Sequence, residues 1–186
     1  IPNMIIYSPK DEIDLQNILY TASLGLPHPI AIRYPRGRGK LEVGSWKLGV
    51  GSFEKIEIGK AHLLKNGTKT AVLSTGFIGN NVSLALENLN QSENIAHYDF
   101  GFIKPLDEKL LHEIFSSFET IITIEDGTIK GGFGSAIVEF STENNYSKPI
   151  KVLGIPDNFI EHGTVEELQK ICKIDVKSLE NIFLNY

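Results

Sequence analysis

Short apolar segments with the pattern of β-strands alternate with amphipathic helical segments along most of this chain. The residues expected to form strands are 58–65, 70–74, 95–100, 120–124 and 150–154. Helices are expected over 78–89, 107–118 and 131–140, with two more beginning at Thr164 and Val176. Strands that alternate with helices are joined by right-handed crossovers, which make the sheet parallel. The sequence therefore predicts an α/β fold with a mostly parallel, doubly wound sheet.

One strand of this sheet is expected to run antiparallel to its neighbour. Asn66-Gly67, a dipeptide favoured in two-residue hairpin turns, separates the first two predicted strands. We therefore expect residues 58–65 to form an antiparallel edge strand joined by a hairpin to residues 70–74.

The first 36 residues predict a separate, smaller unit. Residues 4–7 and 30–34 have the strand pattern, and Asp11 is placed to begin a helix between them. A single strand–helix–strand unit cannot bury both faces of its sheet, so the chain is expected to begin within a larger domain. From residue 37 the periodicity gives way to Gly, Ser and scattered charge. We therefore expect residues 1–36 to be the tail of one domain, 37–58 a linker and 59–186 a complete second domain.

Composition excludes several classes of function. The 186 residues contain 18 Lys and Arg against 23 Asp and Glu, a formal net charge of −5. This balance argues against nucleic acid or an anionic membrane as a partner. The single cysteine, Cys172, excludes an internal disulfide and a cysteine-based metal cluster. No signal peptide or membrane-length apolar segment is evident, so a cytoplasmic protein is expected.

The most suggestive site is a basic segment that follows the predicted strand at residues 30–34. Arg33, Arg36 and Arg38 are spaced there by proline and glycine. Guanidinium groups bind phosphate and carboxylate through a planar fork, which favours an anion site at the strand end. A basic surface loop in an acidic protein is an equally good interpretation.

Three further features are candidates for a site or an interface. Glu125-Asp126 follows a predicted strand, where ligands bind in open α/β sheets. Because adjacent strand residues point to opposite faces, we favour contacts between domains over an acid/base pair. His162 lies in a loop that could reach the mouth of an active site, although a structural hydrogen bond is favoured. The glycines of residues 131–134 could bind phosphate at a helix start, but tight helix packing is the better interpretation. The other histidines, His97 among them, are expected to be ordinary surface or edge residues.

Five motifs follow one another in an order and spacing that resemble a known family. They are Ser8-Pro9-Lys10-Asp11-Glu12 with Leu19-Tyr20-Thr21-Ala22, Arg33-Tyr34-Pro35-Arg36-Gly37, Phe102-Ile103-Lys104-Pro105-Leu106-Asp107, Glu125-Asp126 with Gly131-Gly132-Phe133-Gly134-Ser135, and Gly154-Ile155-Pro156-Asp157 with Phe159-Ile160-Glu161-His162-Gly163. The chain resembles the C-terminal part of 1-deoxy-D-xylulose-5-phosphate synthases, which belong to the transketolase superfamily. It departs from the family at Gly101, where arginine is usual.

The resemblance implies a function for the complete enzyme. Such an enzyme condenses pyruvate with glyceraldehyde 3-phosphate, releases CO2 and forms 1-deoxy-D-xylulose 5-phosphate for isoprenoid, thiamine and pyridoxal synthesis. It uses thiamine diphosphate and Mg²⁺, and family members are homodimers. The family's Gly-Asp-Gly cofactor motif is not found here, nor is the segment whose glutamate protonates the aminopyrimidine ring. We therefore expect this chain alone to bind neither cofactor and to be inactive.

The resemblance also assigns roles to particular residues. Arg33 and Arg36 match the motif that holds the phosphate of the acceptor substrate, and no residue of this chain is expected to be catalytic. Tyr34, Glu125, Asp126 and His162 are expected in the site or at an interface.

Two alternatives remain open. The chain could belong to another thiamine-dependent enzyme, such as a transketolase or the β-subunit of a 2-oxo acid dehydrogenase. It could also be a free-standing flavodoxin-like binding module that begins near residue 60.

Overall fold

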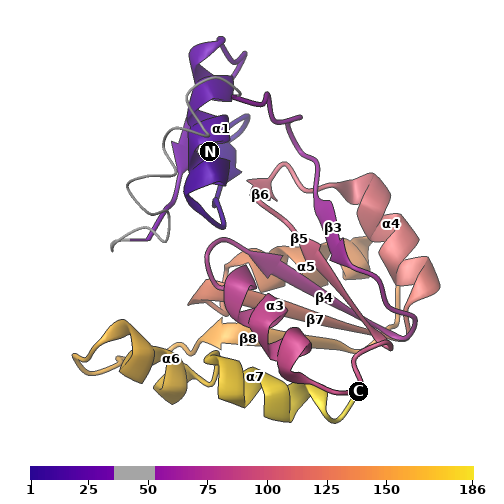
Figure 1. Ribbon diagram of the computed structural model, residues 1–186. Coiled ribbons are helices and arrows are strands. Elements are labelled where there is room, and N and C mark those ends of the chain that lie inside the picture. Colours follow the sequence, from indigo (N-terminus) through magenta and orange to yellow (C-terminus); the bar gives the residue numbers. More distant parts are fainter. Residues whose placement is uncertain (36–52) are drawn as a thin grey trace.

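The computed structural model describes residues 1–35 and 53–186, which form a five-stranded sheet and a three-stranded sheet (Figure 1). The larger sheet has the strand order β3-β5-β4-β7-β8. Its strands are β3 (His62–Lys65), β4 (Thr70–Thr75), β5 (Ile95–Asp99), β7 (Thr120–Thr128) and β8 (Ile150–Ile155). All neighbouring pairs are parallel except β3 with β5. The predicted mostly parallel α/β fold with an antiparallel edge strand is confirmed.

The partner of the antiparallel edge strand differs from the prediction. β3 pairs with β5, Leu63 lying opposite Tyr98, and not with β4. Both edges of β4 are taken by the parallel neighbours β5 and β7, so no edge is left for a hairpin. A Cβ atom at Gly67 would lie 2.1 Å from the amide nitrogen of Ala96. The Asn66-Gly67 segment therefore crosses closely over the start of β5.

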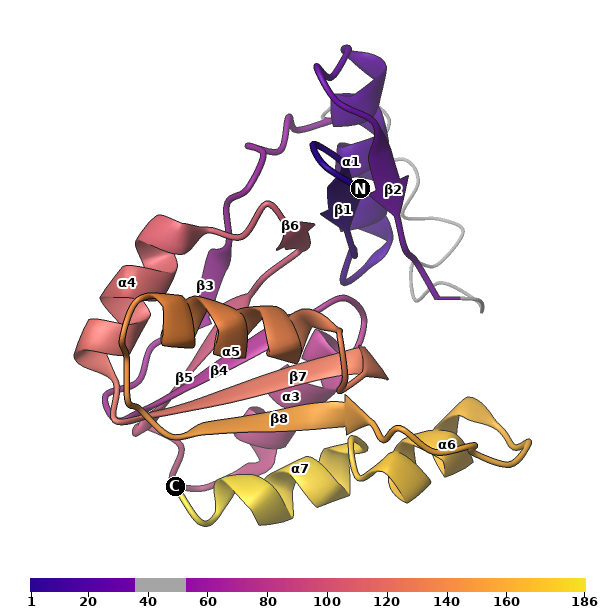
Figure 2. The ribbon, with the colours of Figure 1, turned by 180° about the vertical axis from the view of Figure 1, so that it is seen from behind.

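Helices cover both faces of the larger sheet, as Figures 1 and 2 show from opposite sides. α3 (Gly79–Asn88) and α7 (Val176–Phe183) contribute buried residues to one hydrophobic cluster. α4 (Glu108–Ser117) and α5 (Phe133–Glu143) contribute to the other. Consecutive strand residues belong to opposite clusters. Ile121 and Ile122 are both fully buried, Ile121 in the cluster on the α5 side and Ile122 in the cluster on the α3 side. This double burial explains why the strands are continuously apolar.

α6 (Val165–Cys172) lies beyond the carboxyl end of β8 (Figure 2). Its start is defined by a capping box, in which Thr164 and Glu167 bind each other's backbone N–H groups. Cys172 is partly buried against the cluster on the α3 side. No helix within residues 1–35 and 53–186 is long and apolar enough to cross a membrane.

The smaller sheet joins the N-terminal residues to the rest of the chain. β1 (Ile5–Tyr7) leads to α1 (Glu12–Ser23), which Asp11 caps, and then to β2 (Ile30–Ile32). β1 is the central strand, parallel to β2 on one side and antiparallel to β6 (Phe102–Lys104) on the other. β6 was not predicted, and it follows β5 after only two residues. The N-terminal unit therefore pairs directly with the segment that leaves the larger sheet.

Gly101 stands where β5 turns into β6. A Cβ atom there would lie 2.7–2.8 Å from the ring and hydroxyl of Tyr7, which is buried and donates a hydrogen bond to Asp14. Tyr7 therefore occupies the space that an arginine side chain at position 101 would need. This packing explains why glycine, and not the family's usual arginine, fits at position 101.

We predict that residues 59–186 fold without the N-terminal unit. All five strands of the larger sheet and the helices on both of its faces lie within this range. Removing residues 1–58 exposes Phe102 and takes Lys10 away from Asp99, so the thermal transition should remain cooperative but shift to lower temperature. Scanning calorimetry of both proteins would test this, and loss of the cooperative transition would contradict the domain boundary.

Candidate functional site

Arg33 is the arginine of the basic segment that lies within the described residues. It directly follows β2, and its N–H donates to the Tyr7 carbonyl oxygen at 2.8 Å. Its own carbonyl oxygen accepts a hydrogen bond from Ser8 Oγ at 3.2 Å. Hydrogen bonds with Tyr7 at the end of β1 and with Ser8, the next residue, therefore hold the backbone of Arg33. Arg36 and Arg38 lie outside the described residues.

The Arg33 side chain reaches across to the end of β7. Its Nη1 lies 2.6 Å from Asp126 Oδ1, and its Nη2 donates to the backbone carbonyl oxygen of Asp126 at 2.7 Å. The Arg33 side chain remains 46% exposed, so a ligand can approach it. These two contacts join residues 93 positions apart and link the N-terminal unit to β7 of the larger sheet.

Glu125 and Asp126 point to opposite faces of β7. In the pairing with β8, Ile124 lies opposite Leu153, but the next pair is Thr128 with Ile155. The extra residues of β7 form a bulge beyond Ile124. Glu125 still pairs regularly with Thr75 of β4, so its side chain follows ordinary strand alternation and faces α5, while Asp126 points the other way and meets Arg33.

Glu125 is buried, with 4% of its surface exposed, and it caps helix α5. Its Oε2 accepts the N–H of Phe133 at 2.9 Å, and its Oε1 accepts the N–H of Gly134 at 2.8 Å. Helix N-termini favour negative charge because their first N–H groups have no partner within the helix. Burial raises the pKa of Glu125, and the amides of Gly134 and Phe133 oppose that rise.

Glycines allow the backbone to close around this carboxylate. A Cβ atom at Gly132 would lie 2.3 Å from Glu125 Oε2, and one at Gly154 would lie 3.0 Å from Glu125 Cγ. The glycine-rich start of α5 thus binds the protein's own carboxylate with two of its amides. This supports packing over phosphate binding as the role of residues 131–134.

A small hollow lies beside the Arg33–Asp126 pair. It has a volume of about 40 Å³ and is lined by Ser8, Arg33, Tyr34, Pro35, Phe77 and Asp126. Tyr34, 63% exposed, is one of its walls. His162 is exposed in the segment between β8 and α6 and does not line this hollow. The structure thus brings Arg33, Tyr34 and Asp126 together.

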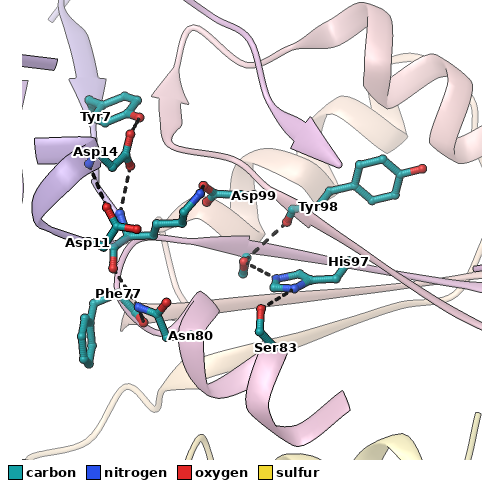
Figure 3. A network of polar contacts seen from close by, with 11 residues as sticks. Tyr7, Asp11, Asp14, Phe77, Asn80, Ser83, His97, Tyr98 and Asp99 are labelled. Atoms are coloured by element: carbon teal, nitrogen blue, oxygen red, sulfur yellow. Dashed lines mark hydrogen bonds and ion pairs between the residues drawn. The ribbon is translucent and has the colours of Figure 1, made fainter. Parts of the chain in front are cut away.

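A second polar contact between the two units joins Lys10 to Asp99, which Figure 3 labels at the end of β5. Lys10 Nζ lies 3.6 Å from Asp99 Oδ2, at the carboxyl end of β5. The backbone of Lys10 is held by Asn80 Nδ2, which donates to its carbonyl oxygen, and by Asp14 Oδ2, which accepts its N–H. Asp99 is 2% exposed, and its Oδ1 has no hydrogen-bond partner within residues 1–35 and 53–186. Burial raises the pKa of Asp99 to about 7, although Lys10 opposes the rise.

His97 was wrongly expected at the surface. It is fully buried on β5, where its ring nitrogens contact Ser74 Oγ at 2.7 Å and Ser83 Oγ at 3.3 Å (Figure 3). Burial, reinforced by Lys10 and Lys65, lowers the pKa of His97 to about 4. Its polar partners come from β4 and α3, so no local sequence signal marks it as a core residue.

Comparison with known proteins agrees with this architecture. Residues 59–179 match the transketolase C-terminal domain. The chain belongs to this family. It is 46% identical over 180 residues to 1-deoxy-D-xylulose-5-phosphate synthase of Parabacteroides distasonis and 48% identical over 181 residues to that of Bacteroides thetaiotaomicron. Each alignment covers 96% of this chain but only 28% and 27% of the relative, so the chain spans just over a quarter of their length.

A solved structure shares the fold of the whole chain. It is that of a split-gene transketolase in an inactive β4 tetramer, with a TM-score of 0.83 and 25% identity. The match covers all of this chain and 58% of the other. The recognition of a transketolase-like C-terminal region related to the synthases is therefore confirmed.

We predict that Glu125→Gln destabilises the protein. The substitution retains one acceptor oxygen but places an NH2 group against a helix N–H, so one buried donor loses its partner. The free energy of unfolding should fall by about 1–3 kcal/mol. Urea denaturation would measure it, with Glu139→Gln on the exposed face of α5 as the matched control. Equal stabilities of the two variants would contradict the capping role.

We also predict that Asp99 makes stability depend on pH. Because the folded-state pKa of Asp99 is about 7 and its ordinary value is 3.8, the folded protein binds the extra proton between these values. The contribution of the Asp99 carboxyl group to the free energy of unfolding is therefore fully present below pH 4 and is lost as pH rises toward 7. The free energy of unfolding of the wild type, measured relative to Asp99→Asn, should fall by about 1.4 kcal/mol per pH unit at most.

Denaturant unfolding at several pH values would measure this difference, in which the titration of other groups cancels. Asp157→Asn is the control, because Asp157 is 66% exposed. A difference between wild type and Asp99→Asn that stays constant from pH 4 to 7 would rule out the raised pKa.

Proposed function

We propose that this chain is the C-terminal part of a 1-deoxy-D-xylulose-5-phosphate synthase. The complete enzyme would be a cytoplasmic transferase that condenses pyruvate with glyceraldehyde 3-phosphate, releases CO2 and forms 1-deoxy-D-xylulose 5-phosphate. Support comes from identities of 46% and 48% to two such synthases over 96% of this chain. In this proposal residues 1–36 end the pyrimidine-binding domain, 37–58 form a linker and 59–186 form the C-terminal domain.

The role proposed for this chain is to bind the phosphate of glyceraldehyde 3-phosphate. The observation that carries it is the exposed guanidinium of Arg33, which is held by backbone and side chain beside a hollow at the sheet's carboxyl edge. A guanidinium held in place binds phosphate with little further loss of side-chain entropy. Arg36 is proposed as the second cation, and Tyr34 as a wall of the site.

The cofactors of the complete enzyme are not matched by the residues described here. Residues 1–35 and 53–186 contain no group of three His, Cys, Asp or Glu side chains that could hold a metal ion. The buried carboxylates of Glu125 and Asp99 already face the α5 amides and Lys10. We propose that thiamine diphosphate and Mg²⁺ are held by parts of the enzyme outside this sequence, and that this chain alone is inactive.

The two alternative functions are less well supported. The Arg-Tyr-Pro-Arg-Gly motif at residues 33–37 favours a synthase over a transketolase or the β-subunit of a 2-oxo acid dehydrogenase. A free-standing module beginning near residue 60 would leave β6 without its partner β1. For the complete enzyme we propose a homodimer.

We predict that Arg33→Ala in the complete synthase impairs use of the acceptor selectively. A hydrogen bond between charged groups contributes about 1.5–3 kcal/mol, so KM for glyceraldehyde 3-phosphate should rise roughly 10- to 100-fold. KM for pyruvate should change little, because pyruvate carries no phosphate. Arg33→Lys should restore part of the loss, since it keeps the charge but not the fork. Steady-state kinetics with both substrates varied would measure these effects.

The control for this experiment is Arg38→Ala, which lies beyond the first glycine of the motif and should be nearly neutral. Arg36→Ala is expected to behave like Arg33→Ala. If Arg33→Ala raises both Michaelis constants equally, Arg33 supports the fold and does not bind the phosphate.

A further inference from the structure

We propose that Asp126 is a positioning residue for the acceptor phosphate site, because it holds the guanidinium of Arg33 in the orientation that binds phosphate. This inference rests on the proposed function, in which Arg33 contacts the phosphate of glyceraldehyde 3-phosphate. Asp126 itself does not contact the substrate; it acts through Arg33.

Asp126 uses only part of the hydrogen-bonding capacity of Arg33. A guanidinium has five N–H groups, of which Asp126 receives one from Nη1 and one from Nη2. Among the described residues, the other three N–H groups have no hydrogen-bond partner. Asp126 thus engages part of the fork and leaves donors for an incoming anion.

Asp126 is itself firmly held. It lies in the β7 bulge, next to Glu125, whose carboxylate is fixed by the amides of Phe133 and Gly134. One of its contacts with Arg33 uses the backbone carbonyl oxygen, which cannot rotate as a side chain does. The position of the α5 N-terminus is therefore transmitted through Glu125 and Asp126 to Arg33.

Asp126 also limits the conformational freedom of the Arg33 side chain. A half-exposed arginine side chain samples many rotamers, and ordering it on binding weakens affinity. The backbone of Arg33 is fixed by Tyr7 and Ser8, but these contacts leave its side chain free to rotate. Asp126 supplies the contacts that restrict the side chain. Alanine at position 126 keeps the backbone contact with Nη2 but removes the Oδ1 contact with Nη1, so it should weaken phosphate binding even though a negative charge is lost.

The test uses the complete synthase with both substrates varied. Asp126→Ala should raise KM for glyceraldehyde 3-phosphate about 10-fold and leave KM for pyruvate within about twofold of wild type. Inorganic phosphate, used as a competitive inhibitor against glyceraldehyde 3-phosphate, should bind weaker by a similar factor. Asp126→Asn keeps an acceptor oxygen for Nη1 and should restore most of the loss. Asp157→Ala is the matched control, because Asp157 forms an exposed ion pair with Lys130 at 3.6 Å.

A double-mutant cycle separates positioning from a general effect on the fold. In an Arg33→Ala background, Asp126→Ala should have no further effect on either KM, because its only route to the substrate is gone. A further rise in KM for glyceraldehyde 3-phosphate in that background would overturn the proposal. If Asp126→Ala does not fold, Asp126→Ser is measured with the same expectations.

The outcomes distinguish this inference from the proposed function. If Arg33→Ala raises KM for glyceraldehyde 3-phosphate but Asp126→Ala leaves it unchanged or lowers it, Arg33 binds phosphate without positioning and this inference fails alone. If Arg33→Ala has no selective effect, the proposed phosphate site fails and the inference fails with it.

Discussion

The pairing of β1 with β6 is the contact on which the arrangement of this protein depends. β1 is the middle strand of the smaller sheet, and β6 follows the larger sheet's β5 after two residues. Backbone hydrogen bonds between strands are directional, so this pairing fixes the register of the N-terminal unit against the larger sheet. The loop after β1 and the residue after β2 are thereby brought to the carboxyl ends of β4, β5 and β7. The Lys10–Asp99 and Arg33–Asp126 ion pairs are consequences of that placement.

The carboxyl edge of a parallel sheet is the usual place for a ligand, because the crossover helices begin there and offer unpaired N–H groups. In this protein the α5 N-terminus is occupied by Glu125, so its positive end does not face solvent as a free anion site. Arg33, a half-exposed cation contributed by the N-terminal unit, lies at this edge. In the function that we propose, the larger sheet supplies the scaffold and the N-terminal unit supplies the anion-binding group.

Much of the fold could be predicted from the sequence, because local patterns determine it. The alternation of strand and helix, the antiparallel edge strand and the Thr164–Glu167 capping box are all present in the structure. The pairing of β3 with β5 could not be predicted, since it depends on competition for the edges of β4. β6 has three residues, too few for a periodic signal. The burial of His97 depends on Ser74 and Ser83, which lie 23 and 14 residues away.

Individual residues of the candidate site could be predicted from the sequence, but the contacts between them could not. Arg33 and the Glu125-Asp126 pair each stood out from their neighbours in sequence, but their contact spans 93 positions and depends on β6. The opposite directions of Glu125 and Asp126 follow from strand alternation. Their partners, the amides of Phe133 and Gly134 and the side chain of Arg33, are brought to them by the tertiary fold.

His97 and Asp99 lie two residues apart on β5, and their pKa values are shifted in opposite directions. Burial lowers the pKa of His97 to about 4 and raises the pKa of Asp99 to about 7. Between about pH 4 and 6.5, the folded protein therefore keeps a proton on Asp99 and none on His97, whereas the unfolded chain has the reverse. Unfolding in this range moves one proton from a carboxyl group to an imidazole and exchanges none with the buffer through this pair. The strand thus carries a pair of ionisable groups whose combined charge is zero when the protein is folded and zero again when it is unfolded.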